Sequence, residues 1–316
     1  MNNYDEIDVS IIYVVYKNTS LVEESIKTVV QYSQGFKYEI IVVDNSNDKE
    51  TFDLLKSRIN NATLIDANDN LGFGKGNNLG VEHAKGKYLF FLNNDTLLVN
   101  NAIYELFSFM EKNESCGACG PNLYTYDMKP NSSFSKKEWT LKRLKHVNSL
   151  FFLFKKNFIK RTAFFNYSAK NIELKGDIIG ASLMIRHNLF DLLGGFDKDI
   201  FMYGEDRLLC HRVLKETKYK MYNIPSSKII HFEGGSFKSQ NSFQCKSLVD
   251  GEYIFYCKAY GYDIGKKYLL SMKKIYKKKM LLARILRKKL LIEKYNNFVI
   301  AYSKKIEEIN DNHSGE

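Results

Sequence analysis

Residues 38–46 read YEIIVVDNS, a β-branched run that ends in a carboxylate and two further polar side chains. Residues 88–95 read YLFFLNND and end in the same way. Apolar runs of this length with polar ends are typical of buried strands in a parallel sheet. Because the carboxyl ends of such strands line one crevice, we expect Asp44 and Asp95 to face the same pocket.

Strand-like and helix-like segments alternate through the first 121 residues. Strands are expected at 8–16, 38–44 and 88–92, and helices at 19–32 and 49–58. This alternation predicts an α/β fold with a Rossmann-like, mainly parallel sheet flanked by helices. Further on, we expect a strand at 178–185, two short strands that end near His231, and a helix at 243–260. Between these parts, residues 122–175 form a basic, aromatic stretch with Trp139 and the cluster 150–154, which is interpreted as an insertion or a lid.

The formal net charge of +11 is concentrated in two segments. Residues 122–175 carry 12 basic and 3 acidic residues, and residues 266–294 carry 12 basic and 1 acidic residue. Localised positive charge suits an anionic membrane surface or a polyanion. The sequence has no secretion signal and no apolar run of the roughly 18 residues that a membrane span requires, so a cytoplasmic protein is expected.

Apolar residues in the second basic segment fall largely on one helical face. This pattern predicts a basic amphipathic tail that lies on anionic lipid at the inner face of the cell membrane. Leu281 and Ile285 fall off that face, and Lys279 intrudes on it. Packing on the rest of the chain and an oligomer contact remain alternatives, whereas nucleic-acid binding would leave the apolar face unexplained. The residues of the face are Tyr268, Met272, Ile275, Tyr276, Leu282, Leu286 and Leu290.

Several polar residues at expected strand and helix ends suit chemistry on a phosphorylated ligand. Asp44 could accept a hydrogen bond from a ribose or a pyrimidine, or could cap a helix. Asp95 and His231 could bind a cation that bridges to phosphate oxygens, or could be a turn aspartate and a structural histidine. Glu205 and Asp206 begin an expected helix, where they could supply a general base or simply favour the helix dipole.

The loop at residues 70–78, NLGFGKGNN, matches neither GxGxxG nor a P-loop. Its glycines are expected to form a tight turn that presents Asn70, Asn77 and Asn78 to a ligand. After the first strand the chain reads Tyr16-Lys17-Asn18-Thr19, which lacks the glycine fingerprint that an NAD-dependent dehydrogenase requires.

In combination, these motifs resemble the inverting family-2 glycosyltransferases, particularly their rhamnosyltransferase-like branch. The resemblance covers about residues 8–260, in order, and the combination is far more specific than any single motif. The motifs are VVYKN at 14–18, VVDNS at 42–46, NLGF at 70–73 with GNN at 76–78, LNND at 92–95, GGFD at 194–197, FMYGED at 201–206, and His231 with GGS at 234–236.

The resemblance implies a GT-A fold, a nucleotide diphosphate sugar as donor, and a divalent cation, Mn²⁺ or Mg²⁺. It implies that Asp44 binds the nucleoside and that Asp95 and His231 bind the cation and the diphosphate. It also implies that Asp206 is the general base, with Glu205 beside it in the catalytic pair. The usual DxD motif is Asn93-Asn94-Asp95 here, which favours dTDP-rhamnose over a UDP-hexose or UDP-N-acetylhexosamine. The further donor-binding residues implied are Tyr16, Asn18, Asn70, Gly72, Asn77, Asn93 and Asn94.

Three parts of the chain follow from this interpretation. Residues 1–121 are expected to bind the nucleotide sugar, and residues 122–261 to bind the acceptor and complete the catalytic site. Residues 262–316 would be the membrane-associating tail. We expect a glycan or lipid-linked glycan acceptor, as in bacterial surface polysaccharide synthesis, and no nucleic-acid partner. A non-catalytic nucleotide- or glycan-binding module is the alternative from another class.

Overall fold

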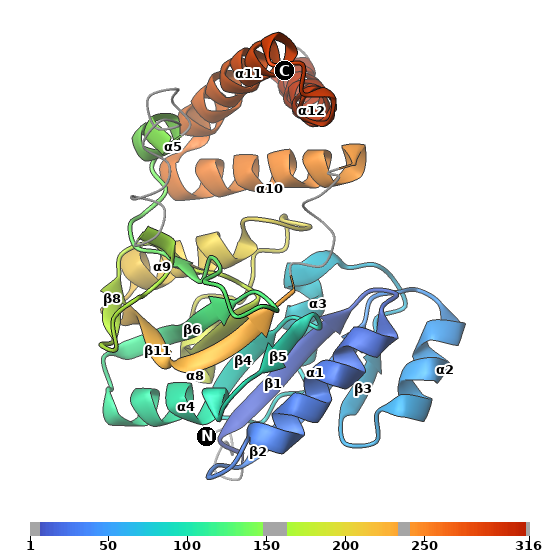
Figure 1. Ribbon diagram of the computed structural model, residues 1–316, viewed down its shortest axis with the longest axis vertical. Helices are drawn as coiled ribbons and strands as arrows, with labels where there is room; N and C mark the ends of the chain where they lie inside the picture. Colours follow the sequence, from blue (N-terminus) through green and yellow to red (C-terminus); the bar gives the residue numbers. More distant parts are fainter. Residues whose placement is uncertain (1–6, 148–162, 233–240, 314–316) are drawn as a thin grey trace.

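A computed structural model describes residues 7–147, 163–232 and 241–313 in two layers, an α/β layer and a helical layer (Figure 1). The predicted cluster 150–154 and the glycine motif at 234–236 lie outside the described residues. None of the helices in the described ranges is long and apolar enough to cross a bilayer.

Four strands form the parallel half of the nine-stranded sheet, in the order β3-β2-β1-β4. Ile12 of β1 lies opposite Ile41 of β2 on one side and Phe91 of β4 on the other. All four strands therefore end at one edge, as predicted. They span β1 (Val9–Val15), β2 (Tyr38–Asp44), β3 (Thr63–Asp66) and β4 (Tyr88–Leu92).

The second half of the sheet is mixed. β10 runs antiparallel to both β4 and β6, so β6 and the parallel β11 point in the same direction as β4 again. β11 is one strand with a register shift between Ile224 and Lys228, where two short strands were predicted. The single strand expected at 178–185 is divided into β9 and β10. The bounds are β5 (Thr96–Leu98), β6 (Cys116–Tyr124), β7 (Phe134–Ser135), β8 (Ile172–Leu174), β9 (Asp177–Ile178), β10 (Ser182–Arg186) and β11 (Lys220–His231).

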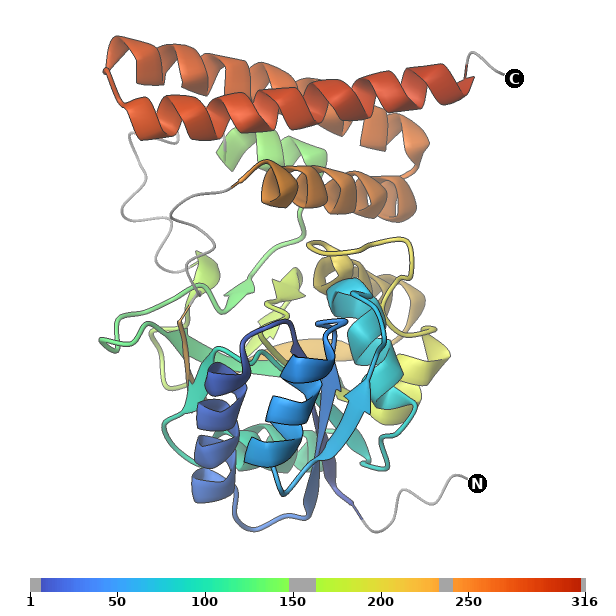
Figure 2. The same cartoon turned by 90° about the vertical axis from the view of Figure 1, so that its right-hand side faces the viewer.

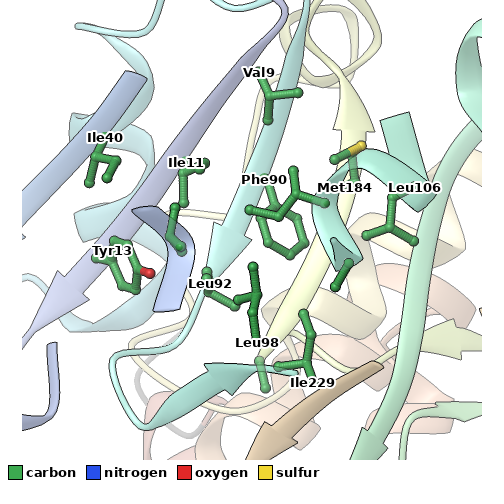
Figure 3. Packing of buried hydrophobic residues seen from close by; sticks show 14 of the residues in the cluster. Val9, Ile11, Tyr13, Ile40, Phe90, Leu92, Leu98, Leu106, Met184 and Ile229 are labelled. Carbon is green, nitrogen blue, oxygen red and sulfur yellow. The ribbon is translucent and has the colours of Figure 1, made fainter. Parts of the chain in front are cut away.

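Helices cover both faces of the sheet because alternate strand residues point to opposite sides. Ile11 and Tyr13 pack with residues of α1 and α4, whereas Ile12 packs with residues of α8 and α9. Figure 3 shows the first of these cores, in which Phe90 and Leu92 lie near Leu98. The helices of this layer are α1 (Thr19–Tyr32), α2 (Lys49–Arg58), α3 (Gly72–Val81), α4 (Ala102–Lys112), α8 (His187–Leu192) and α9 (Glu205–Glu216). The short helix α5 (Leu141–Val147) packs instead with the C-terminal helices.

Three C-terminal helices form the second layer, beyond the edge at which β1, β2 and β4 end (Figures 1 and 2). α11 (Tyr262–Ile285) and α12 (Lys289–His313) form an antiparallel hairpin that packs on α10 (Ser242–Tyr260). Tyr268 and Met272 are buried in this layer, and the Tyr268 hydroxyl lies 3.1 Å from the Tyr302 hydroxyl.

This packing corrects the prediction for the amphipathic tail. Tyr276 stacks on Phe298 of α12 with ring centroids 4.4 Å apart. The first part of the face predicted to lie on lipid thus packs against protein, because the partner of its apolar stripe is α10 and α12. Leu282, Leu286 and Leu290 remain exposed.

A close backbone contact joins the helical layer to the α/β layer. Gly251 of α10 lies against the loop before α9, and a Cβ added there would lie 2.0 Å from the Tyr203 carbonyl oxygen. On the other side of the contact, Gly204 adopts a φ of 112° that favours glycine. Helix α10 therefore fixes the backbone that leads into Glu205 and Asp206.

Substitution of Gly251 by alanine tests this contact. The new methyl group cannot avoid a backbone oxygen by a rotamer change, so Gly251→Ala should destabilise the protein by about 3 kcal/mol. Gly194→Ala is the control, since its methyl group meets no atom within 4 Å and adds only the strain of a left-handed residue, about 1 kcal/mol. Denaturant titration measures both, and equal losses of stability would contradict the contact.

Candidate functional site

Asp44 lies at the end of β2 with one oxygen held and the other available to a ligand. Its Oδ1 accepts a 2.9 Å hydrogen bond from the Ser46 N–H. Its Oδ2 is buried and has no hydrogen-bond partner among the described residues. Buried carboxylate oxygens are normally hydrogen-bonded, so this atom suits a donor group from a bound molecule.

The sheet register brings the end of β4 close to Asp44. Ile12 is opposite Ile41 and Phe91, and three residues further along are Asp44 and Asn94. Asn93, Asn94 and Asp95 are all partly buried at this edge. The two polar strand ends therefore meet at one edge, separated by β1.

The loop after β1 lies at the same edge and carries two of the predicted residues. Tyr16 is 51% exposed, and the Lys17 Nζ lies 5.5 Å from the centroid of its ring. The Asn18 Oδ1 accepts a hydrogen bond from the Ser20 hydroxyl, and the Lys17 N–H donates to the Ser46 hydroxyl. The exposed Tyr16 ring is thus available to stack on a planar group.

The glycine-rich loop connects the end of β2 to the start of α9. The Asn45 side-chain amide donates to the Gly72 carbonyl at 2.8 Å, and the Phe73 N–H donates to the Phe201 carbonyl at 3.0 Å. Gly72 has a φ of 78°, and a Cβ there would lie 2.1 Å from the Phe201 oxygen. Only glycine allows this approach.

The asparagines of this loop hold protein structure. The Asn77 side chain is buried and donates to the Phe73 carbonyl one turn earlier in α3. Asn78 exchanges two hydrogen bonds with the Phe196 backbone, and Asn70 accepts from the Gly72 N–H. This geometry gives Asn77 a structural role in place of the predicted donor contact, since its amide turns inward.

Asp95 and His231 form a close pair. The Asp95 Oδ1 lies 3.3 Å from the His231 Nε2, and the side chains are 15% and 13% exposed. Pairing of β5 with β11 sets Thr96 opposite His231, and the Phe232 N–H donates to the Asp95 carbonyl at 3.0 Å. Residues distant in sequence are thus joined by one strand pairing.

The Asp95–His231 pair fits a divalent cation. Two adjacent ligands of an octahedral ion with bonds of about 2.1 Å are about 3 Å apart. A carboxylate with an imidazole suits Mn²⁺ better than Mg²⁺, which prefers oxygen ligands alone. No cluster of three or more His, Cys, Asp or Glu side chains suited to a metal occurs within the described ranges.

Asp206 is the second residue of α9 and lies near the end of β4. Its Oδ2 accepts from the Gly180 N–H at 2.8 Å, and its Oδ1 accepts from the Arg207 N–H at 2.7 Å. The carbonyl of Ala181, the residue after Gly180, accepts a hydrogen bond from the Asn93 N–H at 2.9 Å. The segment 180–181 therefore links Asp206 to the turn that carries Asp95.

Glu205 is buried against the glycine-rich loop. Its Cγ lies 3.6 Å from the position that a Cβ on Gly74 would occupy. Burial, and then the negative charge of Asp206, raise the pKa of Glu205 to about 8. The group is therefore largely protonated at neutral pH, in contrast to an ordinary glutamate.

Three charged residues that the sequence did not indicate lie behind Asp206. Arg207 forms an ion pair with Glu252 of α10, and its Nε lies 4.0 Å from Asp177 of β9. Burial raises the pKa of Asp177 to about 7, and the charge of Arg207 opposes this shift. Because Asp177, Arg207 and Glu252 are far apart in the sequence, no motif indicated that they interact. The one available signal was that Arg207 directly follows the acid pair.

A cavity of about 800 Å³ lies beside the end of β11. Trp139 stacks on Phe164 in its wall at 6.0 Å between centroids, and Tyr167 lies nearby with 53% exposure. The Asn131 side chain lines the cavity and donates to the His231 carbonyl at 3.5 Å. An aromatic pocket thus borders the strand that carries the histidine.

The chain is similar to several known glycosyltransferases. The model of glycosyl transferase family 2 matches residues 10–178, more than half of the chain. A hexosyltransferase of low-salt glycan biosynthesis, Agl10 of Haloferax volcanii, is 26% identical over 217 residues, which are 66% of this chain and 62% of that protein. The poly(ribitol-phosphate) beta-glucosyltransferase of Bacillus spizizenii is 29% identical over 112 residues, or 34% of this chain and only 18% of that protein.

Two solved structures share the fold at low sequence identity. GalNAc-T7 with UDP, GalNAc and Mn²⁺ aligns with a TM-score of 0.57 and 17% identity, over 80% of this chain and 50% of that chain. The mannosyltransferase PcManGT of Pyrobaculum calidifontis, with GDP-Man and Mn²⁺, aligns with a TM-score of 0.53 and 15% identity, over 97% and 89%. The α/β layer is thus a GT-A-like fold, and the chain belongs to glycosyltransferase family 2.

Proposed function

We propose that the protein transfers one sugar from a nucleotide diphosphate to an acceptor hydroxyl with inversion at the anomeric carbon. The observation that carries the proposal is the gathering of Asp44, the Asp95–His231 pair and Asp206 at one edge of the sheet. Each of the three serves a different part of the donor or acceptor.

The donor side of the site is formed by strand ends. The open Oδ2 of Asp44 accepts a hydrogen bond from the ribose or the base, and Tyr16 stacks on the nucleoside. Asp95 and His231 would hold the cation, and Asn93 and Asn94 lie next to Asp95 in the same turn, where they would contact the diphosphate. A bound cation would neutralise the negative charge that develops on the departing nucleoside diphosphate.

Asp206 is the proposed general base. Hydrogen bonds from the Gly180 and Arg207 N–H groups fix the orientation of its carboxylate. It takes the proton of the acceptor hydroxyl as the new C–O bond forms at the anomeric carbon and the bond to the diphosphate breaks. Glu205, protonated at neutral pH, adds no second negative charge and braces the start of α9 against the glycine-rich loop.

For the acceptor, we propose a glycan or lipid-linked glycan, as in bacterial surface polysaccharide synthesis. The aromatic cavity with Trp139 and Tyr167 suits the apolar faces of sugar rings. The basic helix α5 beside α11 suits a peripheral position on the inner face of the membrane.

Two donor classes are compatible with these residues. Asn93, which stands where DxD motifs carry their first carboxylate, favours dTDP-rhamnose. The relatives named as glucosyl-, mannosyl- and hexosyltransferases favour a hexose, so a UDP-hexose or UDP-N-acetylhexosamine is the alternative. A non-catalytic binding module is less well supported, because a buried acid with a strongly raised pKa beside a cleft carboxylate is typical of catalytic sites.

Transfer assays with Asp206→Asn test the proposal. Release of nucleoside diphosphate is measured with dTDP-rhamnose, UDP-glucose and UDP-N-acetylglucosamine as donors and short glycans as acceptors. With the preferred donor, the variant should lose about 10²–10⁴-fold in kcat because no group accepts the proton. Asp53→Asn, at an exposed position of α2, is the matched control and should keep full activity.

Full transfer by a folded Asp206→Asn protein would remove Asp206 from the mechanism. If the wild-type protein binds a donor and turns over none of the three, the non-catalytic module is the better account.

The raised pKa of Glu205 predicts a specific pH dependence of stability. Between about pH 4.5 and pH 8 the folded protein keeps this proton and the unfolded chain loses it, so this group lowers the free energy of unfolding as pH rises. Glu205→Gln removes the effect, and the melting temperature of the variant relative to wild type should therefore rise from pH 5 to pH 8. The exposed Glu50→Gln is the control, and a melting-temperature difference for Glu205→Gln that stays constant from pH 5 to pH 8 would contradict the neutral, buried acid.

A further inference from the structure

The turn between α11 and α12 carries a dense group of exposed apolar side chains. Six large apolar residues within 281–291 are between 38% and 80% exposed. We call this group the hairpin tip: Leu281, Leu282, Ile285, Leu286, Leu290 and Leu291.

The tip is held in a defined conformation. Arg287 has a φ of 51°, the Lys288 N–H donates to the Ala283 carbonyl at 2.9 Å, and the Arg287 N–H donates to the Arg284 carbonyl at 3.1 Å. This is the hydrogen-bond pattern that closes a helix with a left-handed residue. Since Ala283 is buried against the hairpin, the leucines of the turn are held outward.

Burial of the tip would be strongly favourable. Transfer of one leucine or isoleucine side chain out of water contributes about 1.5–3 kcal/mol. Soluble proteins rarely expose contiguous apolar groups of this size without a partner. The tip is therefore a binding surface, and its surroundings define the partner.

Positive charge surrounds the tip. Arg284, Arg287, Lys288 and Lys289 are all exposed, and no acidic residue occurs between Asp263 and Glu293. Helix α5 packs beside α11 (Figure 1), where Leu144 lies near Tyr268 and Met272, and carries the exposed Lys142 and Lys145 on the same helical layer. Apolar side chains ringed by cations match a lipid surface, where hydrocarbon lies beneath anionic headgroups and each basic residue contributes about 1 kcal/mol.

We propose that the hairpin tip inserts into an anionic lipid bilayer while the basic residues of the turn and α5 bind its headgroups. Leu281 and Ile285, which do not fit a helix lying flat on lipid, fit a hairpin that enters by its turn. The helical layer lies beyond the edge at which β1, β2 and β4 end (Figure 2), so a docked tip brings lipid to the side of the proposed site. Only this last step, delivery of a lipid-linked acceptor, rests on the proposed function.

Vesicle flotation with the full chain tests the proposal. Wild-type protein should bind vesicles of phosphatidylcholine with about 40% phosphatidylglycerol more tightly than pure phosphatidylcholine vesicles, as the charge on the turn requires. The triple variant Ile285→Ser, Leu286→Ser, Leu290→Ser should lose at least tenfold in affinity for the anionic vesicles. The substituted side chains are 57–80% exposed, so an unchanged melting temperature confirms that the variant is folded.

The matched control removes three exposed apolar residues elsewhere, by Val30→Ser, Leu54→Ser and Leu192→Ser, and should bind as wild type does. Equal vesicle binding by the tip variant, or equal binding of wild type to neutral vesicles, overturns the proposal. A wild-type dimer that the tip substitutions make monomeric, without vesicle binding, would show instead that a second copy covers the tip.

Transfer to a soluble glycan separates this proposal from the proposed function. The tip variant should keep that activity, because none of its substitutions touches the site. Absence of soluble transfer by wild type with normal vesicle binding would contradict the proposed function alone.

Discussion

The pairing of β5 with β11 is the constraint on which the site depends. It sets Thr96 opposite His231 and thereby brings the Asp95 carboxylate within 3.3 Å of the imidazole. The turn that carries Asp95 is also held by a chain of buried hydroxyl groups. The Ser25 hydroxyl oxygen lies 3.3 Å from that of Thr96 and 2.9 Å from that of Tyr13. A buried chain of this kind leaves the turn few alternative conformations, so the acid and the imidazole are preorganised before a ligand arrives.

The helical layer is coupled to the same site. Gly251 packs on the loop before α9, and Glu252 pairs with Arg207, which directly follows the acid Asp206. Helix α10 thus supports the proposed general base from one side and the α11–α12 hairpin from the other. The hairpin that we propose to dock on lipid and the proposed general base are therefore parts of one connected structure.

Much of the fold could be predicted because it follows from local patterns. Apolar runs that end in Asp44 and Asp95 specify parallel strands with polar ends at one edge, and the structure has this arrangement. Other features depend on contacts that no local pattern encodes. Periodicity identified the apolar stripe with Tyr268 but could not distinguish lipid from α10 as its partner. Similarly, Asn77 in a glycine-rich loop could have faced a ligand, and only the completed helix turns its amide inward.

Anomalous scattering from crystals grown with a nucleoside diphosphate and Mn²⁺ would locate the cation and the nucleotide together. We expect one strong manganese peak with both the Asp95 carboxylate and the His231 imidazole as ligands, and a nucleoside in hydrogen-bond contact with Asp44. A manganese ion bound elsewhere, or a nucleotide bound away from the ends of β2 and β4, would contradict this expectation.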